Sequence, residues 1–371
     1  MSAYVIAARR TAIVPHGGAF ARLSIEDLAA PVIAACLAGA GLSPDRVDEV
    51  IVSNALGAGG NPARRVALAA GLPLRVAGLS IDRQCAGGLD ALLIARALID
   101  SGAAEVVIAG GVESASRRPL RFATDPDGGP PVAYDQAPFT PWPDRDPPVH
   151  IAAAALADRL AISAVEQAAW AVASHAKARA MPGWPEIVCL ARQDRDPFAR
   201  ALTPALAARA RPVAGSITAA TAAVAADGAA FCVVVSQRIA AAVPHALRLV
   251  GGLTLGADPA EPGLAPVPAI LAVLQRAGLT PADIVQAEVM EAYAVQAIAC
   301  VQGAGLIPDR VNPGGGALAR GHAIGASGAV LAVRLFHGLG QGVGLAAIAA
   351  AGGIGTALLA ERQSSKPRNT A

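Results

Sequence analysis

Cys85 and His322 are the residues of this chain whose types and settings are suited to nucleophilic chemistry. Each lies at a glycine-rich turn that opens a long apolar-periodic segment, CAGGLDALLIARALIDSG from the cysteine and HAIGASGAVLAVRLFHGLG from the histidine. A thiol at a helix N-terminus has its thiolate stabilised by the helix dipole and by free N–H groups, and a nearby imidazole can take its proton. We therefore expect a nucleophile and a base at these two turns.

The other cysteines do not form the pattern of a metal site or a disulfide framework. The five cysteines are odd in number and widely spaced, and the sequence contains no CxxC or Cys/His cluster. Apolar runs such as VIAACLAG and FCVVVS indicate small buried hydrophobes. These cysteines are Cys36, Cys189, Cys232 and Cys300. We expect no metal.

An internal repeat organises the elements that carry the two turns. GLSPDRVDEVIVSNAL at 41–56 matches GLTPADIVQAEVMEAY at 278–293, each with a helix-start signal that leads into an apolar strand, at an offset of 281 − 44 = 237. AGGVESA at 109–115 matches AGGIGTA at 351–357 at an offset of 351 − 109 = 242. The repeat implies two halves of like architecture.

Cys85 and His322 occupy equivalent positions in these halves, since 322 − 85 = 237 is again the offset. Apolar strands that alternate with helices of this length favour an α/β fold, with a mostly parallel sheet in each half and layers of helices. In such units the functional groups collect at turns beyond the strand ends. A pseudo-twofold packing of the halves would bring the thiol and the imidazole together.

The repeat also suggests domain boundaries. We expect the N-terminal half at residues 1–116, an inserted loop domain plus the end of the N-terminal half at 117–245, the C-terminal half at 246–362 and a polar tail at 363–371. The insertion has no counterpart within the repeat. It is either a surface excursion or a lid that binds substrate, as long ordered loops often are.

The insertion begins with a segment that lacks periodicity. Residues 117–150 are rich in Pro, Asp and Gly and predict an irregular loop. Helices are expected at about 151–180, where Ser163 and Glu166 resemble a capping box.

Composition excludes several classes of protein. Of the 371 residues, 54% are hydrophobic and 16% are charged, which is far from the composition of a disordered chain. A net charge of +2 and an aromatic content of 3% provide neither a basic field nor a stacking surface, so we expect no nucleic-acid partner.

A membrane span is not expected either. The longest stretch without a charged residue, 335–360, is punctuated by glycines, and each glycine in a helix costs about 1 kcal/mol relative to alanine. Two buried strands joined by glycine-rich turns fit this stretch better. The sequence MSAYVIAARRTAIV lacks the order of a secretory signal and indicates the first strand of a cytoplasmic protein.

Four segments together resemble the thiolases: IDRQCAGGLDA, AGGVESAS, NPGGGALARGHAIGASG and AGGIGTA. The resemblance extends from Tyr4 to Glu361 and is weakest at 117–150. It implies a five-layered αβαβα fold of two like halves with a loop domain, assembled as a homodimer or homotetramer. It also implies that a cysteine takes an acyl group from a coenzyme A thioester, which is a substrate, and that no cofactor is bound.

The resemblance assigns roles to single residues and exposes departures from the family pattern. Cys85 matches the family nucleophile, and His322 matches the histidine that activates it and helps to hold the thioester oxygen. Ala349 stands where condensing members have a second acid/base cysteine, and alanine cannot transfer a proton. Met290 replaces the asparagine that orders a water in the oxyanion hole. Both replacements predict impaired Claisen chemistry, because acid/base help contributes about 10²–10⁴-fold and an oxyanion donor about 2.7–4 kcal/mol.

The resemblance also assigns further residues to the oxyanion hole or the substrate pocket. Ala351 and Gly353 belong to the last glycine-rich turn. His150 matches a histidine that lines the acyl and pantetheine pocket, and Ala223 replaces a polar residue near the pantetheine arm. Because this replacement alters the expected coenzyme A contacts, the acyl group arrives either on coenzyme A or on an acyl carrier protein. Three arginines could meet a nucleotide phosphate or form a solvated loop: Arg117, Arg118 and Arg121.

Three functions remain open. The first is an acyltransferase that loads Cys85 and passes the acyl group to an acceptor other than a coenzyme A carbanion. The second is a working thiolase with a substitute base, for which Cys300 and His150 are the candidates. The third is a non-catalytic scaffold that works beside a small partner domain. The retained Cys85 favours the first over the third, and Ala349 and Met290 oppose the second.

Overall fold

Ten strands form one mixed sheet in the computed structural model, which describes residues 2–57 and 59–362. The order is β12-β13-β14-β11-β1-β10-β5-β3-β4, with β2 paired to β10. Strands of the N-terminal half are β1 (Ala3–Arg10), β2 (Val14–Pro15), β3 (Glu49–Ser53), β4 (Leu79–Ile81), β5 (Val106–Ser114) and β10 (Ala226–Ser236). Strands of the C-terminal half are β11 (Leu247–Gly256), β12 (Ile284–Val289), β13 (Gly342–Ala350) and β14 (Ile354–Arg362). The halves join where β1 pairs with β11.

The expectation of a separate, mostly parallel sheet in each half is wrong. Among the described strands of the large sheet, parallel pairing is confined to β3 with β4, β3 with β5, and β12 with β13. β13 and β14 are connected by the turn at 351–353, and so short a connection can join only antiparallel strands. The prediction of two buried strands within 335–360 is confirmed by β13 and β14, although the helix before them extends to Gly338.

Helices complete a five-layered αβαβα arrangement, as expected, because the N-terminal and the C-terminal strands of the continuous sheet lie on either side of the same two helices. α3 and α11 pack against each other and contact strands of both halves, so they form the middle layer. α1 and α2 cover the outer face of the N-terminal strands, and α8 and α9 cover the outer face of the C-terminal strands. The bounds are α1 (Ile25–Ala40), α2 (Pro62–Ala69), α3 (Gly87–Asp100), α8 (Pro266–Ala277), α9 (Ala294–Gly303) and α11 (Ile324–Gly338).

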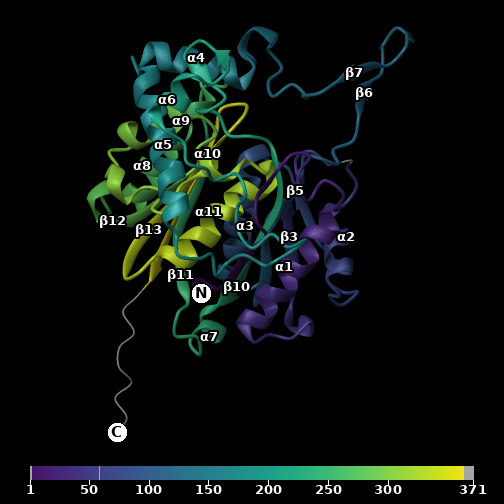
Figure 1. Ribbon diagram of the computed structural model, residues 1–371. Helices are drawn as coiled ribbons and strands as arrows, with labels where there is room; N and C mark the ends of the chain where they lie inside the picture. The colour runs from purple at the N-terminus through teal and green to yellow at the C-terminus, as the bar shows by residue number, and fades with distance from the viewer. Residues whose placement is uncertain (1, 58, 363–371) are drawn as a thin grey trace.

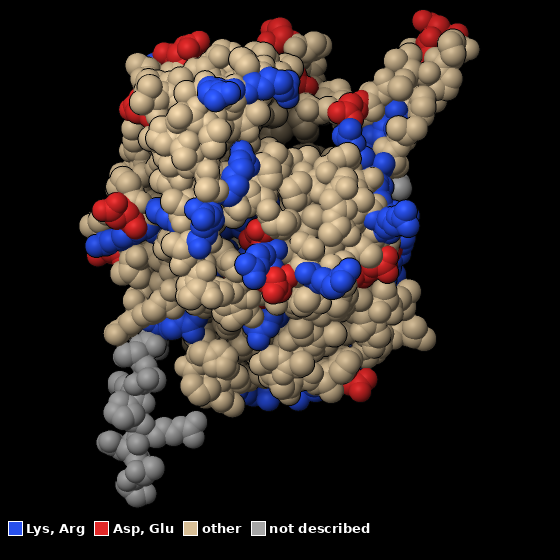
Figure 2. All heavy atoms as spheres, in the orientation of Figure 1, with Lys and Arg blue, Asp and Glu red and all other residues tan. Residues whose placement is uncertain are grey.

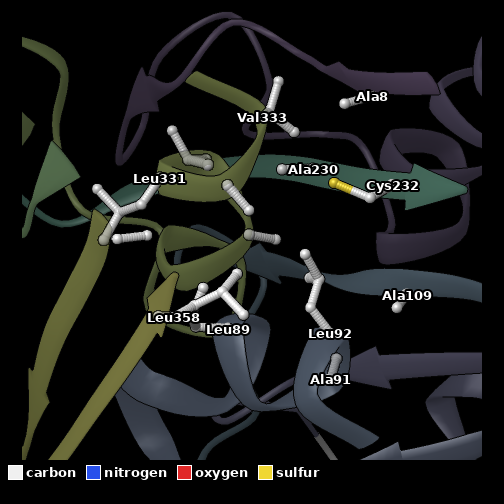
Figure 3. Close-up of a cluster of buried hydrophobic side chains, with 14 of the residues drawn as sticks. Ala8, Leu89, Ala91, Leu92, Ala109, Ala230, Cys232, Leu331, Val333 and Leu358 are labelled. Carbon is white, nitrogen blue, oxygen red and sulfur yellow. The ribbon is translucent and has the colours of Figure 1, made fainter. Parts of the chain in front are cut away.

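The central core lies around the middle layer. Leu89 and Leu92 of α3 and Leu331 and Val333 of α11 are buried there, with Leu358 of β14 (Figure 3). Full burial of each such side chain stabilises the fold by about 1.5–3 kcal/mol. The two helices that begin at the candidate turns are therefore held rigidly between the halves.

The structure confirms one repeat match and corrects the other. Gly41 and Gly278 both end a helix in the left-handed conformation, with φ of 65° and 66°, and each leads through a single helical turn into a strand, β3 or β12. The match at an offset of 242 is wrong, because 109–111 lies inside β5 whereas 351–353 forms a turn. The equivalent strands are β5 and β13, which begin at an offset of 342 − 106 = 236.

The insertion contains more structure than the sequence predicts at its start. Within 117–150, β6 and β7 form a two-stranded arm that projects from the body (Figure 1). The predicted helices are present as α4 and α5, and the capping box is confirmed, since Ser163 Oγ accepts from Glu166 N at 3.2 Å. The bounds of the elements outside the main layers are β6 (Arg121–Ala123), β7 (Val132–Tyr134), α4 (Val149–Arg159), α5 (Ala164–Ala180), α6 (Pro204–Ala208), β8 (Pro212–Ala214), β9 (Ile217–Thr218), α7 (Gln237–Ala240) and α10 (Ala317–Arg320).

The surface agrees with the low charge of the sequence. On the face shown in Figure 2, positive and negative side chains are scattered among larger uncharged areas. No helix within the described residues is long and apolar enough to cross a membrane. In the same part of the chain, no group of His, Cys, Asp and Glu is placed to hold a metal ion. The expected tail at 363–371 lies outside the described residues, and the domain boundaries stay predictions.

Candidate active site

A strained turn presents Cys85 between β4 and α3. Gln84 has a φ of 49°, in the left-handed region that costs a non-glycine residue roughly 1–2 kcal/mol. Asp82 holds this conformation, because its Oδ1 accepts hydrogen bonds from Gln84 N at 2.9 Å and from Gln84 Nε2 at 3.1 Å. The sequence Asp-Arg-Gln-Cys therefore contains the residue that stabilises the turn as well as the thiol that the turn presents.

His322 is held through its backbone by the extended segment that precedes β10. His322 N donates to Val224 O at 2.7 Å, and Ala226 N donates to His322 O at 3.1 Å. The same segment binds the turn before α9, where Ala223 N donates to Ala292 O at 2.9 Å. The extended segment 223–226 thus connects the His322 turn to the turn before α9 through backbone hydrogen bonds.

Ser327 fixes the orientation of the imidazole. Nδ1 of His322 lies 2.7 Å from Ser327 Oγ, which itself donates to Ala323 O at 2.9 Å. Because the hydroxyl has only one hydrogen, it accepts from Nδ1–H. The tautomer follows: Nε2 carries the free lone pair and can accept a proton.

The structure brings Cys85 and His322 together, with Nε2 3.1 Å from Sγ. Burial raises the pKa of Cys85 to about 12 and lowers the pKa of His322 to about 4. For Cys85, desolvation of the charged form outweighs the favourable backbone contact, and this shift opposes the expected thiolate in the protein alone. The resting pair is a neutral thiol hydrogen-bonded to a neutral imidazole.

Glycines in both motifs allow α3 and α11 to approach closely at the site. A Cβ at Gly88 would lie 2.7 Å from Ala329 N, and a Cβ at Gly328 would lie 2.4 Å from Leu89 N. Side chains at these positions would force the helices apart. The glycines that follow Cys85 and His322 thus set the separation of the two turns.

Glu113 is a site residue that the sequence reasoning missed. This carboxylate at the end of β5 is buried and accepts hydrogen bonds from Ala55 N and Gly325 N, both at 3.0 Å, and from Asn54 Nδ2 at 2.7 Å. It therefore ties the loop after β3 to the first turn of α11. Burial raises the pKa of Glu113 to about 7 despite these donors. The sequence signal that could have identified Glu113 is a single acidic residue within the apolar run VVIAGGVES.

A cavity of about 190 Å³ opens beside the Cys85–His322 pair. Its wall includes Ala223, Ala349 and Ala351, which the sequence placed at the pocket. The remaining lining residues come mainly from the turns around α3, α4, α9 and α11, and they are Gln84, Gln136, Phe139, Val149, Ala152, Ala153, Leu156, Glu261, Pro262, Gly263, Ala292, Tyr293, Gln296, Ile324 and Ala350. Most of them are apolar, as suits an acyl group.

Three predicted pocket residues do not line this cavity. Met290, which follows the last residue of β12, is 1% exposed and packs in the central core. Gly353 is buried in the turn between β13 and β14, where its φ is 73° and an added Cβ would lie 2.5 Å from Ala257 O. His150 lies in the first turn of α4 but is absent from the wall, which its neighbour Val149 joins. Their assignment to the oxyanion hole or the acyl pocket stays a prediction.

The structure also shows where Cys300, the suggested substitute base, and the three arginines at the start of the insertion lie. Cys300 is fully buried between α9 and the C-terminal strands, outside the cavity. Arg118 and Arg121 line a larger adjoining hollow of about 620 Å³, which shares Gln84 with the first cavity. Arg117 instead donates to the backbone oxygen of Arg22.

Comparisons with known proteins agree with the fold. The family models "Thiolase, N-terminal domain" and "Thiolase, C-terminal domain" match residues 3–238 and 244–362. The chain is 40% identical to a protein named "Putative acetyl-CoA C-acetyltransferase YhfS" from Bacillus subtilis, over 97% of this chain and 99% of that protein. It is 36% identical to the "Acetyl-CoA acetyltransferase" of Cupriavidus necator, with the same coverage.

Solved structures of two related proteins superpose on most of the chain. Acat5 thiolase from Ascaris suum in complex with coenzyme A gives a TM-score of 0.89 at 28% identity, covering 98% of this chain and 100% of that chain. Human mitochondrial 3-ketoacyl-CoA thiolase in complex with CoA also gives 0.89, at 30% identity and 98% coverage of each chain.

Proposed function

Because the chain belongs to the thiolase family, we propose that it is an acyltransferase that forms an acyl thioester on Cys85 and passes the acyl group to an acceptor. The observation that carries the proposal is the 3.1 Å contact between Cys85 Sγ and His322 Nε2 beside an apolar cavity. The donor is an acyl-coenzyme A or an acyl carrier protein, and no bound cofactor takes part.

The first half-reaction follows from the neutral resting pair. As Sγ of Cys85 attacks the thioester carbonyl carbon, the thiol proton passes to Nε2 of His322. The Nδ1–H bond to Ser327 keeps Nε2 facing the sulfur. Collapse of the tetrahedral intermediate breaks the donor's C–S bond, and the departing thiolate takes the proton from Nε2. The products are an acyl thioester on Cys85 and a free donor thiol.

Similarity to named proteins supports coenzyme A as the acyl carrier. Relatives at 40% and 36% identity carry acetyl-CoA acetyltransferase names, and two matched structures contain coenzyme A. Arg121 provides positive charge in the hollow next to the cavity, which suits a nucleotide phosphate, whereas the charge of Arg118 is balanced by Asp135 in the same wall. Ala223, in the cavity wall, leaves an acyl carrier protein as the alternative donor.

The residues in the cavity wall support the proposal that the proton-transfer step of Claisen chemistry is altered. Of the described residues in its wall, those with a titratable side chain besides Cys85 and His322 are Glu261 and Tyr293. Glu261 is paired with Arg159, and burial raises the pKa of Tyr293 to about 12, so that it stays protonated. Ala349 contributes no proton acceptor. We therefore propose that α-proton removal is impaired, whereas formation of the acyl-enzyme is retained.

A working thiolase is the second candidate, favoured by the 36% identity to the acetyl-CoA acetyltransferase of Cupriavidus necator. It requires a substitute base. Cys300 and His150, the two substitutes suggested by the sequence, are not in the cavity wall. Thiolysis of acetoacetyl-CoA separates the two functions, since it requires proton transfer at the α-carbon.

The assembly is a further part of the proposal. A homodimer or homotetramer is supported by apolar side chains on the arm, of which Leu120 is 88%, Val132 64% and Phe122 57% exposed. Burial of such side chains between subunits would remove them from water. A cytoplasmic location and association with a small partner domain stay predictions from the sequence.

Intact-mass measurement tests acyl-enzyme formation. The protein is incubated with a panel of acyl-coenzyme A and acyl carrier thioesters, beside the variants Cys85→Ala and Cys189→Ala. We expect an acyl increment on the wild type and on Cys189→Ala, whose altered cysteine is exposed and distant in sequence, and none on Cys85→Ala. Absence of an increment with every donor would contradict the proposal and would favour the scaffold function.

A further inference from the structure

Asp90 is a buried carboxylate that the proposed reaction does not use. It lies in the first turn of α3, five residues after Cys85, and is 2% exposed. Its neighbours Leu89 and Ala91 belong to the central core (Figure 3). Carboxylates are rarely buried unless they are paired, so the partners of Asp90 indicate what it does.

The two oxygens of Asp90 have different partners. Oδ1 accepts hydrogen bonds from the hydroxyls of Thr254 at 2.5 Å and Thr356 at 2.9 Å, which lie opposite each other on β11 and β14. Oδ2 accepts a hydrogen bond from a guanidinium nitrogen of Arg83 at 3.1 Å. One carboxylate therefore connects two strands of the C-terminal half to the turn that presents Cys85.

The strands that Asp90 contacts continue to the wall of the cavity. Thr356 is paired in register with Ile348 of β13. The next residue along β13 is Ala349, which lines the cavity. The turn that contains Cys85 also packs against β13 and β14. Asp90 thus ties this turn to the strands that carry part of the cavity wall.

The contact between Asp90 and Arg83 is an ion pair. Burial raises the pKa of Asp90, whereas the hydrogen bond from Thr254 and the charge of Arg83 favour the ionised carboxylate. The Arg83 side chain is 45% exposed, so the pair adds little to the stability of the fold. Its effect on geometry is larger, because Arg83 directly precedes Gln84, whose φ is 49°. Such backbone strain persists only where the surrounding residues are fixed.

We propose that Asp90 is a positioning residue for the thiol. By holding Arg83, it keeps the strained turn in place and Sγ of Cys85 aligned with Nε2 of His322. This inference rests on the proposed acyl transfer at Cys85. Neither Asp90 nor Arg83 is among the described residues that line the cavity. Their pair should therefore affect the rate of the acylation step rather than the binding of the donor.

Arg83→Met tests the proposal at an exposed position, because it leaves Asp90 in contact with both threonines. We expect the acylation rate of Cys85 at saturating donor to fall about tenfold or more, since a misplacement of about 1 Å costs about 10²-fold. The donor concentration that gives half the maximal rate should change little. Arg83→Lys should retain most of the rate, because Oδ2 accepts a single hydrogen bond. The time course of the acyl increment, followed by intact mass, measures these rates.

Two double variants and one control make the test specific. Asp90→Asn should also slow acylation, and its addition to Arg83→Met should cause no further loss, because both changes break the same pair. In the His322→Asn background no imidazole remains to be aligned, so Arg83→Met should have no further effect. Arg96→Met, which removes an ion pair with Asp100 on the same helix, is the control and should retain the wild-type rate.

The possible contrary results differ in what they overturn. Equal acylation rates in the wild type and Arg83→Met would overturn the inference and leave the proposed function intact. A change confined to the half-saturating donor concentration would make Arg83 a donor-binding residue instead. An equal loss with and without His322 would show a role unrelated to the alignment of the thiol with the imidazole. Absence of an acyl increment on the wild type with every donor would overturn the proposed function, and the inference with it.

Discussion

The two halves of the molecule use one architecture for different chemical groups. The turn before α3 presents Cys85, and the equivalent turn before α11 presents His322. The equivalent strands β5 and β13 end differently, since Glu113 lies near the end of β5 and Ala349 near the end of β13. Glu113 is fixed by hydrogen bonds from four residues, whereas Ala349 contributes only an apolar methyl group to the cavity wall. The duplicated architecture therefore determines where the functional side chains lie, and the residue type at each position determines what chemistry it can perform.

In the function that we propose, this difference separates two steps of catalysis. The groups proposed to form the acyl-enzyme are both present, because the N-terminal half supplies the thiol and the C-terminal half supplies the oriented imidazole. We propose that a group for removing an α-proton is missing, because β13 has Ala349 where it meets the cavity. Substitutions on each side of the comparison should therefore affect the two steps unequally.

The largest expected effect comes from the imidazole. His322→Asn should slow acylation of Cys85 by about 10²–10⁴-fold, because the thiol then lacks its proton acceptor. The time course of the acyl increment, followed by intact mass, measures this rate. His245→Asn, at an exposed histidine, is the control and should retain the wild-type rate. Equal rates in all three proteins would exclude His322 as the base.

A thiol at position 349 should restore proton transfer at the α-carbon of the substrate. Ala349→Cys would place a proton-transfer group in the cavity wall, and we expect acetoacetyl-CoA thiolysis to rise by about 10²-fold. Loss of the substrate's absorbance follows the reaction. Ala349→Val adds comparable bulk without an acid/base group and should give no increase. A similar gain in the valine variant would show that size rather than proton transfer limits the rate.

Glu113 should give stability an unusual dependence on pH. Its pKa is about 7 in the folded protein against a reference value of 4.5, so the folded state holds the proton more tightly. The free energy of unfolding should therefore fall by about 3 kcal/mol as pH rises from below 4.5 to above 7. Urea unfolding at several pH values, compared with Glu113→Gln, isolates this contribution. Parallel pH profiles in the two proteins would contradict the raised pKa.

Removal of the Ser327 hydroxyl should have the smallest effect. Ser327→Ala leaves Nδ1–H without its acceptor and frees the other tautomer, so the acylation rate at saturating donor should fall about tenfold. The KM for the donor should change little, because Ser327 touches the imidazole and is not in the cavity wall. A change confined to KM would indicate a role in donor binding instead.

The sequence predicted the parts of the site that depend on pattern. Equal spacing of Cys85 and His322 within the repeat led to their pairing, and the glycine-rich turns predicted where the middle helices begin. The pairing of β1 with β11 was not predictable in this way, because apolar strands look alike whether they pair in parallel or antiparallel. The joining of the halves into one sheet depends on that tertiary contact.

Side-chain direction and solvation account for the remaining differences. Met290 follows a strand, and one residue of register decides whether such a side chain faces the core or a cavity. The sequence motif AGGVESA contains Glu113 but does not predict its role, because that role depends on backbone donors from two distant loops. The neutral state of Cys85 and His322 results from burial, which the sequence around each residue does not reveal.

Acetoacetyl-CoA thiolysis by the wild-type protein tests most directly the claim that acyl-enzyme formation and α-proton transfer are separated. It is measured on protein that intact mass shows to accept an acyl group on Cys85, with Cys85→Ala as the reference. The account predicts a rate no greater than that of the reference. Rapid thiolysis that depends on Cys85 would contradict the account and show that another group replaces the base missing at Ala349.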